Sequence, residues 1–133
     1  MAATAQYAAT AKVGSALLTS ADTSLTAPTT VGTVFTAAAS GSRIDYIEIQ
    51  GVATTIAGLV NLFIFDGTTY FLWQQVPIIA ITSSTTAPAF TANLSSNGNA
   101  NFMPLCIPTG YSLRATTSVA QTGIRVIAYG GDF

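Results

Sequence analysis

Few residues of this chain could perform chemistry, and their types and spacing favour no reaction. The 133 residues include five carboxylates, four Lys or Arg and no histidine, so the commonest general base and zinc ligand is missing. Asp45 and Glu48 are close in sequence, but a three-residue spacing places them on opposite sides of a regular strand. Asp66 fits better as the first residue of a tight turn. We therefore predict no catalytic residue and no enzymatic activity.

Metal, cofactor and nucleic-acid sites are not indicated either. A calcium site needs several carboxylates in one loop, and no loop here carries two. The four positive charges are scattered from Lys12 to Arg125 and are too few to neutralise a phosphate backbone. The glycines of Ala128–Phe133 lead into no helix, so they do not form a phosphate loop. We expect no metal, no cofactor, no nucleic acid and no small-molecule ligand.

The composition indicates a surface that neighbouring proteins cover. Charged residues are 7 % of the chain and hydrophobic residues 50 %, whereas roughly 25 % charged residues is ordinary. A net charge of −1 gives little protection against self-association. Every apolar run is interrupted well before the roughly 20 residues that a membrane helix needs, and the first residues do not resemble a signal peptide. We expect no membrane association and synthesis in the cytoplasm of the producing cell.

The elements that position these residues are predicted to be strands. From Val31 onward, β-branched and aromatic runs alternate with turn compositions, and no segment has a capped helical stripe. We predict an all-β chain, a single-domain β-sandwich of the jelly-roll type with about eight or nine strands. Residues 1–30 would form an N-terminal arm and a first short strand, and residues 31–133 the sandwich. The expected strands are Val13–Leu18, Thr33–Thr36, Arg43–Val52, Leu59–Phe65, Tyr70–Ile81 interrupted at Pro77, Ala89–Leu94, Phe102–Ile107, Tyr111–Thr117 and Ile124–Tyr129.

Three local features refine this prediction. In Arg43–Gln50 the charged residues change sides between Tyr46 and Ile47, which is typical of a β-bulge. Cys106 cannot form an intrachain disulfide and is expected to be a small core residue. Residues Met1 to about Ala11 hold one large side chain and no charge, so we expect an extended arm that orders only on assembly.

The most apolar stretch, Asn61–Val76, consists of two runs joined by Asp66-Gly67, the typical signal of a β-hairpin. One face of this hairpin can fill the sandwich interior, and the other must meet an arm, a loop or another subunit. Two sets of aromatic residues follow as candidates. The predicted subunit interface contains Phe63, Phe65, Phe71 and Trp73, with Tyr7 anchoring the arm against a neighbouring strand edge. The alternative is a sugar-binding platform of Tyr70, Phe71, Trp73 and Tyr111.

Three motifs follow one another from Gly41 to Phe133. Leu62–Tyr70 has the form LFI-x-DG-x-x-Y, Pro108–Thr116 is a proline-glycine turn before a strand of the L-R-A-x-T kind, and Ala128–Phe133 is A-x-GGD followed by an aromatic residue. In order and spacing they resemble small virion proteins of tailed bacteriophages, the jelly-roll capsid decoration or cement proteins.

The resemblance implies a structural protein that binds the outside of a phage capsid and cements neighbouring capsomers. Its partners would be the major capsid protein and further copies of itself, usually in a trimer. It would be located in the virion, on the capsid exterior, after synthesis in the host cytoplasm. The predicted interface residues would then contact either the capsid or another copy. The alternatives are a tail- or fibre-associated β-sandwich and a carbohydrate-binding module.

Overall fold

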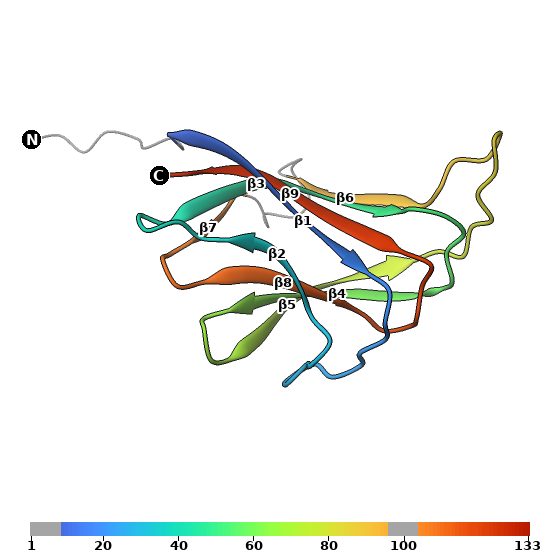
Figure 1. The fold of residues 1–133 in the computed structure, drawn as a ribbon, viewed down its shortest axis with the longest axis horizontal. Coiled ribbons are helices and arrows are strands. Elements are labelled where there is room, and N and C mark those ends of the chain that lie inside the picture. The colour runs from blue at the N-terminus through green and yellow to red at the C-terminus, as the bar shows by residue number, and fades with distance from the viewer. Residues whose placement is uncertain (1–8, 96–103) are drawn as a thin grey trace, which may run out of the picture.

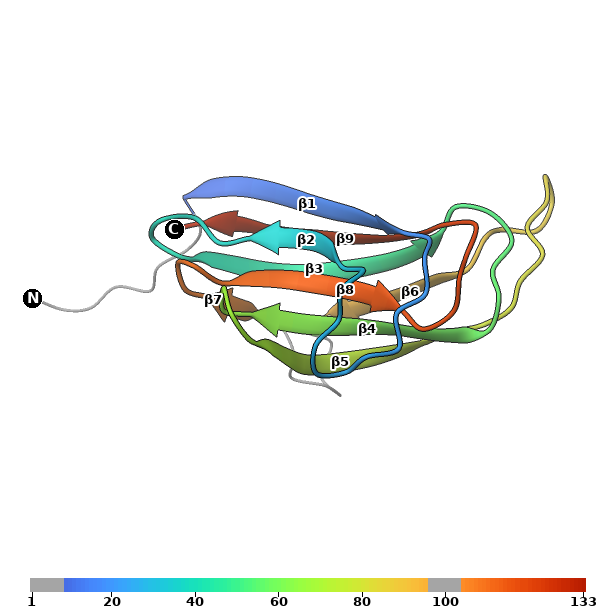
Figure 2. The ribbon, with the colours of Figure 1, turned by 60° about the horizontal axis from the view of Figure 1, so that its bottom comes forward.

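The strands form two facing antiparallel sheets in the computed structural model, which describes residues 9–95 and 104–133 (Figures 1 and 2). The described strands are β1 (Thr10–Leu18), β2 (Gly32–Thr36), β3 (Ser42–Gly51), β4 (Gly58–Phe65), β5 (Tyr70–Ile78), β6 (Thr91–Ser95), β7 (Leu105–Ile107), β8 (Ser112–Thr117) and β9 (Ile124–Asp132). One sheet has the order β1-β9-β3-β6 with β7 also paired to β3, and the other has the order β2-β8-β4-β5. The predicted all-β sandwich is confirmed.

The strands pair as a nested series. β4 pairs with β5, β3 with β6, β2 with β8 and β1 with β9, as if one long hairpin had been rolled into two layers. The first and last strands therefore lie side by side, with Thr10 opposite Asp132 and Leu18 opposite Ile124. In the described residues no helix is present that is long and apolar enough to cross a membrane.

Several strand ends differ from those expected. β1 begins at Thr10, so Thr10 and Ala11, expected in the arm, pair with β9. β5 continues through Pro77, where an interruption was predicted; this is tolerated because β5 is an edge strand, where a missing N–H need not break the ladder. β9 extends past Tyr129 to Asp132. Tyr7 and most of the predicted arm lie outside the described residues.

The predicted bulge in β3 is present, one residue earlier than expected. The register against β9 shifts between Ile44 and Tyr46, so Asp45 is the extra residue. Ile44, Ile47 and Ile49 are fully buried on the inner side. Because the bulge absorbs one residue, Asp45 and Glu48 both lie on the outer side, and the expectation that they lie on opposite sides is wrong.

The core lies between the two sheets and follows the alternation of each strand. Every second residue of the inner strands points inward; the cluster includes Val34, Phe35, Ile44, Ile47, Ile49, Val60, Leu62, Leu113, Ala115, Ile124, Val126 and Ala128. Cys106 is a free, exposed thiol between half-buried Leu105 and buried Ile107. Its expected place in the core is therefore wrong, because its position in β7 faces outward.

Two glycines allow backbones to approach more closely than any side chain would permit. A Cβ on Gly14 of β1 would lie 2.0 Å from the carbonyl oxygen of Val34 in β2, and one on Gly130 of β9 would lie 1.9 Å from that of Arg43 in β3. Only glycine fits at such distances. Gly14 brings the two sheets together along the β1–β2 side, and Gly130 accommodates the bulged part of β3.

Candidate functional site

The five carboxylates are engaged at separate places in the fold. Asp66 accepts hydrogen bonds from the backbone N–H groups of Thr68 and Thr69 in the β4–β5 turn, as its turn role predicts. Arg43 binds Asp45 at 2.6 Å on the surface, and the Tyr129 hydroxyl donates to Glu48 at 3.3 Å. The remaining two carboxylates each organise a network of their own. In residues 9–95 and 104–133, no group of three or more potential metal ligands occurs.

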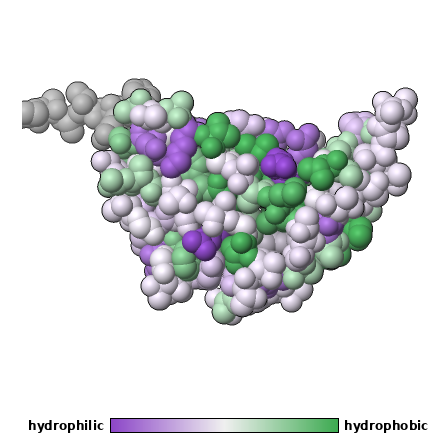
Figure 3. Space-filling model, in the orientation of Figure 1, coloured by the Kyte–Doolittle hydropathy of each residue, from purple (hydrophilic) through white to green (hydrophobic). Residues whose placement is uncertain are grey.

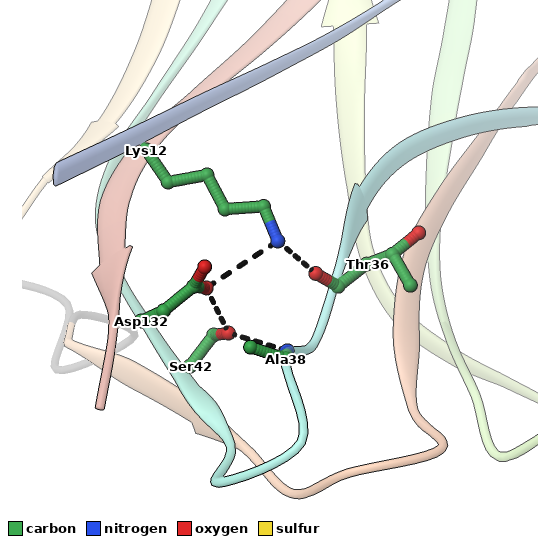
Figure 4. A network of polar contacts seen from close by, with 5 residues as sticks. All are labelled: Lys12, Thr36, Ala38, Ser42 and Asp132. Carbon is green, nitrogen blue, oxygen red and sulfur yellow. Dashed lines mark hydrogen bonds and ion pairs between the residues drawn. The ribbon is translucent and has the colours of Figure 1, made fainter. Parts of the chain in front are cut away.

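Asp132 joins four strands at the end of the sandwich where β1 begins and β9 ends (Figure 4). Its Oδ1 accepts from the Ser42 hydroxyl at 2.6 Å and lies 3.3 Å from the Lys12 ammonium. Lys12 also donates to the Thr36 carbonyl, and Ser42 accepts from the backbone N–H of Ala38. The Ser42 hydrogen bond, and then Lys12, hold the pKa of Asp132 below its ordinary value. The network connects β1, β2, β3 and β9 and has the geometry of a structural clasp.

Asp22 organises the connection between β1 and β2, residues 19–31. Its carboxylate accepts from the backbone N–H groups of Thr30, Ser24 and Thr29 at 2.7–3.0 Å, and these bonds, that of Thr30 first, lower its pKa. The Asp22 N–H donates to the carbonyl of Thr117 at the end of β8. The connection is thus closed on itself and fastened to the four-stranded sheet, whose outer side it follows (Figures 1 and 2).

The centre of the outer side of the four-stranded sheet is covered within this chain, whereas Leu59 and Leu72 beside it are 36 and 39 % exposed. Asn61 and Phe63 alternate with the core residues of β4, so they point away from the sandwich interior. Yet Asn61, Phe63 and Thr116 have at most 1 % of their surface exposed. Asn61 accepts from Gln75 at 2.9 Å and donates to the Thr116 hydroxyl at 3.4 Å. We call this surface, centred on Asn61, Phe63 and Thr116, the covered face.

An arginine lies on an aromatic cluster beside Phe63. The Arg114 guanidinium carbon is 4.2 Å from the ring centre of Phe65, which stacks on Tyr70 at 4.2 Å. Arg114 donates to Tyr70 and to Ser112, at 3.3 and 3.1 Å, and Tyr70 meets Phe63 edge-on at 5.8 Å. In the described part of the chain no carboxylate forms an ion pair with Arg114. The cluster closes one end of the covered face.

The predicted interface residues therefore lie in different environments and do not form one surface. Phe63 is fully buried by its own chain, so its assignment to an interface is wrong: the sheet covers it without a partner. Trp73 packs against the core and Phe65 is half-buried beside Arg114. Phe71 is half-exposed, and Tyr7 lies outside the described residues. At Asn61 and Phe63 the hairpin's second face is covered by the chain itself and needs no other subunit.

The residues of the alternative sugar platform do not act as one surface. Tyr70 is engaged with Phe65 and Arg114, whereas Trp73 and Tyr111 pack against the core. Phe71 is the exposed member. A cavity of about 100 Å³ lies elsewhere, between the end of β1 and the start of β2, lined by Leu17, Leu18, Thr19, Ser20, Thr30, Val31 and Gly32. Ligand pockets usually have roughly 300–1,000 Å³.

The outer side of the five-stranded sheet is different and was not singled out from the sequence. Val13, Leu17 and Tyr129 have 62, 48 and 36 % of their surface exposed, and Val52 has 50 %. Val13 is paired with Tyr129 across β1 and β9. A Cβ on Gly123 would lie 2.5 Å from Val52 and 3.2 Å from Leu17, so these two side chains are neighbours. We call the surface of Val13, Leu17, Val52 and Tyr129 the open face; apolar side chains lie over β1 and β9 in Figure 3.

The signal of the open face was present in the sequence. Ala11, Val13, Ser15 and Leu17 alternate with residues that face β2, and all four are exposed. Val13–Leu18 was predicted as a strand, but the Ala- and Thr-rich composition around it did not indicate that its outer side carries exposed apolar residues. No family model, no curated protein and no solved structure matches this chain.

Proposed function

We propose that this chain is a structural virion protein of a tailed bacteriophage that binds the outside of the capsid as an oligomer and cements neighbouring capsomers. The observation that carries the proposal is the open face, where four large side chains are exposed on a sandwich whose carboxylates are engaged in turns, a clasp and surface pairs. Such a chain is suited to adhesion. The nested strand pairing supports the jelly-roll type that the resemblance implies.

The physical basis is burial of apolar surface across the joints between capsomers. Removing apolar area from water contributes about 25 cal/mol per Å², of which only the surplus over ordering and association costs appears as affinity. A strand that is already held in a sheet has little backbone freedom left to lose on docking. An oligomer that engages several equivalent sites makes its later contacts intramolecular, so that modest interfaces hold tightly together.

Cryo-electron microscopy of the virion that carries this protein tests the location. We expect density for the sandwich on the head lattice at the joints between capsomers. Density on the tail or on fibres would instead support the tail- or fibre-associated alternative. A virion without such density would overturn the proposal.

A binding experiment tests whether the open face contacts the capsid. Capsids lacking the protein are mixed with purified chain and sedimented, and the bound fraction is measured. Val52→Glu places a charge on the open face, at 50 % exposure, and should reduce binding. Ile56→Glu, at 52 % exposure, is the matched control and should bind as the original chain does. Equal loss in both variants would assign adhesion to general surface charge.

A truncation that spares β1 tests the arm. Deleting Met1–Ala11 would remove two residues of β1 together with the arm. Deleting residues 1–8 leaves the paired strand intact. If the arm adds to a neighbouring strand edge, this shorter deletion should weaken capsid binding while the circular dichroism spectrum stays unchanged. Unchanged capsid binding would assign adhesion to the sandwich alone.

A further inference from the structure

The sheet edges differ in how they are protected against pairing with another strand. β2 has five residues and a register shift at Val34, and β5 contains Pro77 and a shift at Trp73. On the opposite side of the five-stranded sheet, β6 and β7 have five and three residues. Short length, bulges and proline are the usual means by which proteins prevent edge-to-edge association.

β1 has none of these protections. It pairs with β9 over nine residues without a register shift and contains no proline. Half of the backbone N–H and C=O groups of an edge strand point away from its neighbour. In the described residues, no backbone hydrogen bond joins Thr10–Leu18 to any segment other than β9. The edge of β1 is therefore long, regular and available.

The single charge of β1 does not guard the edge. Lysine on an edge strand ordinarily repels an incoming strand. Here the Lys12 ammonium binds Asp132 and the Thr36 carbonyl and lies 4.8 Å from the ring centre of Phe35 (Figure 4). It is thus turned toward β2 and the inside of the clasp. The outer residues of β1 are Ala11, Val13, Ser15 and Leu17, all uncharged and exposed.

We propose that β1 pairs antiparallel with β1 of a second copy of this chain, joining the two five-stranded sheets into one continuous sheet. The strand is complementary to itself. A pairing that uses all nine residues puts Gly14 on the two-fold axis, so Val13 lies opposite Ser15 of the second copy, and Leu17 opposite Ala11. Each large outer side chain then meets a small one, and no charge faces a like charge.

The two-fold axis of this pairing is perpendicular to the sheet. Both open faces therefore lie on the same side of the joined sheet, where they form one broad apolar surface. Such a surface would double the area that the proposed capsid contact can use. The pairing itself requires no capsid, so it can be tested on the purified chain.

Light scattering over a range of protein concentrations tests the pairing. We expect a species of twice the 13.6 kDa chain mass, or an even multiple of it. Val13→Glu places two carboxylates diagonally across the axis, and Ser15→Lys does the same with two ammonium groups. Each single substitution should shift the mass to one chain, or to a smaller assembly if other contacts exist. Both sites are exposed, so the circular dichroism spectrum should not change.

The double variant Val13→Glu/Ser15→Lys makes the test specific to the register. In the proposed pairing, the carboxylate introduced by Val13→Glu in one copy lies directly opposite the ammonium introduced by Ser15→Lys in the second copy. The double variant should therefore regain the mass that either single variant loses. Ile79→Glu, at 64 % exposure and outside β1, is the matched control and should keep the original mass.

Three results would overturn the pairing. They are a monomer at every concentration, an oligomer that Val13→Glu leaves intact, and a double variant that stays dissociated. A trimer unaffected by Val13→Glu would thus exclude the β1 contact while leaving the proposed virion function standing, because capsid binding is measured separately.

Discussion

In the two outer sides of the sandwich, apolar composition and exposure run in opposite directions. The covered face belongs partly to the most apolar segment of the chain, Asn61–Val76, yet Asn61 and Phe63 are buried there by the chain itself, as is Thr116 of the neighbouring β8. The open face belongs partly to β1, in an Ala- and Thr-rich region, yet Val13 and Leu17 are exposed. Apolar composition therefore did not identify the available surface. What mattered was whether other parts of the chain meet the same side of the sheet, as Asp22 does at Thr117 and the Arg114 guanidinium does on Phe65.

Removing Phe63 should have the largest effect on stability. Phe63→Ala leaves a cavity beneath the covered face, and we expect the free energy of unfolding to fall by about 3–5 kcal/mol in denaturant titrations. Phe71→Ala is the matched control on the same hairpin. Phe71 is half-exposed, so its removal should cost far less. Similar losses in both variants would mean that Phe63 is accessible and that the covered face is not closed.

Removing the Asn61 side chain should have the second-largest effect on stability. Asn61→Ala removes the acceptor for Gln75 and the donor for the buried Thr116 hydroxyl, and we expect a loss of about 1–3 kcal/mol in the free energy of unfolding. The comparison is Asn93→Ala, at an exposed position of β6, whose loss should lie within about 0.5 kcal/mol. If the free energy of unfolding of Asn61→Ala is unchanged, the hydrogen bonds of Asn61 with Gln75 and Thr116 do not stabilise the covered face.

The connection over the covered face should respond to acid. Because the pKa of Asp22 lies below its ordinary value of 3.8, the carboxylate contributes stability that is present above about pH 4 and is lost as the pH falls through its lowered pKa. Asp22→Asn should lower the denaturation midpoint at pH 7, and the difference from the original chain should shrink toward pH 2.

Asp66 provides a matched carboxylate outside this connection. Its pKa is lowered mainly by the backbone N–H of Thr69, so Asp66→Asn should show the same direction of pH dependence. Hydrogen exchange separates the two variants. Only Asp22→Asn should speed exchange in residues 19–31, and faster exchange there in Asp66→Asn would remove the special role of Asp22.

The smallest change in stability is expected on the open face. Val13→Glu alters a side chain that is 62 % exposed, so the free energy of unfolding of the single chain should change by no more than about 0.5 kcal/mol. Thermal denaturation at high dilution, where copies are separate, measures this. A large loss would mean that Val13 supports the fold, and the contrast between the two faces would disappear.

Local sequence patterns determined most of the fold. Runs of β-branched and aromatic residues between turn compositions indicated the strands, Asp66-Gly67 indicated the hairpin turn, and the change of sides in Arg43–Gln50 indicated the bulge in β3. These features depend on a few neighbouring residues, because side-chain direction in a strand alternates and turns need particular backbone angles. The same locality explains why strand ends at Thr10 and Asp132, which depend on their pairing with each other, were missed.

Only the tertiary structure decided which faces are covered. The covered face is built from contacts between distant segments, such as the Asp22 N–H bound to the Thr117 carbonyl and the Arg114 guanidinium on Phe65. The exposure of Cys106 and Val13 likewise depends on what lies beside them in space. Hydropathy reports how favourable burial would be for a residue, whereas the path of the whole chain determines whether another segment arrives to bury it.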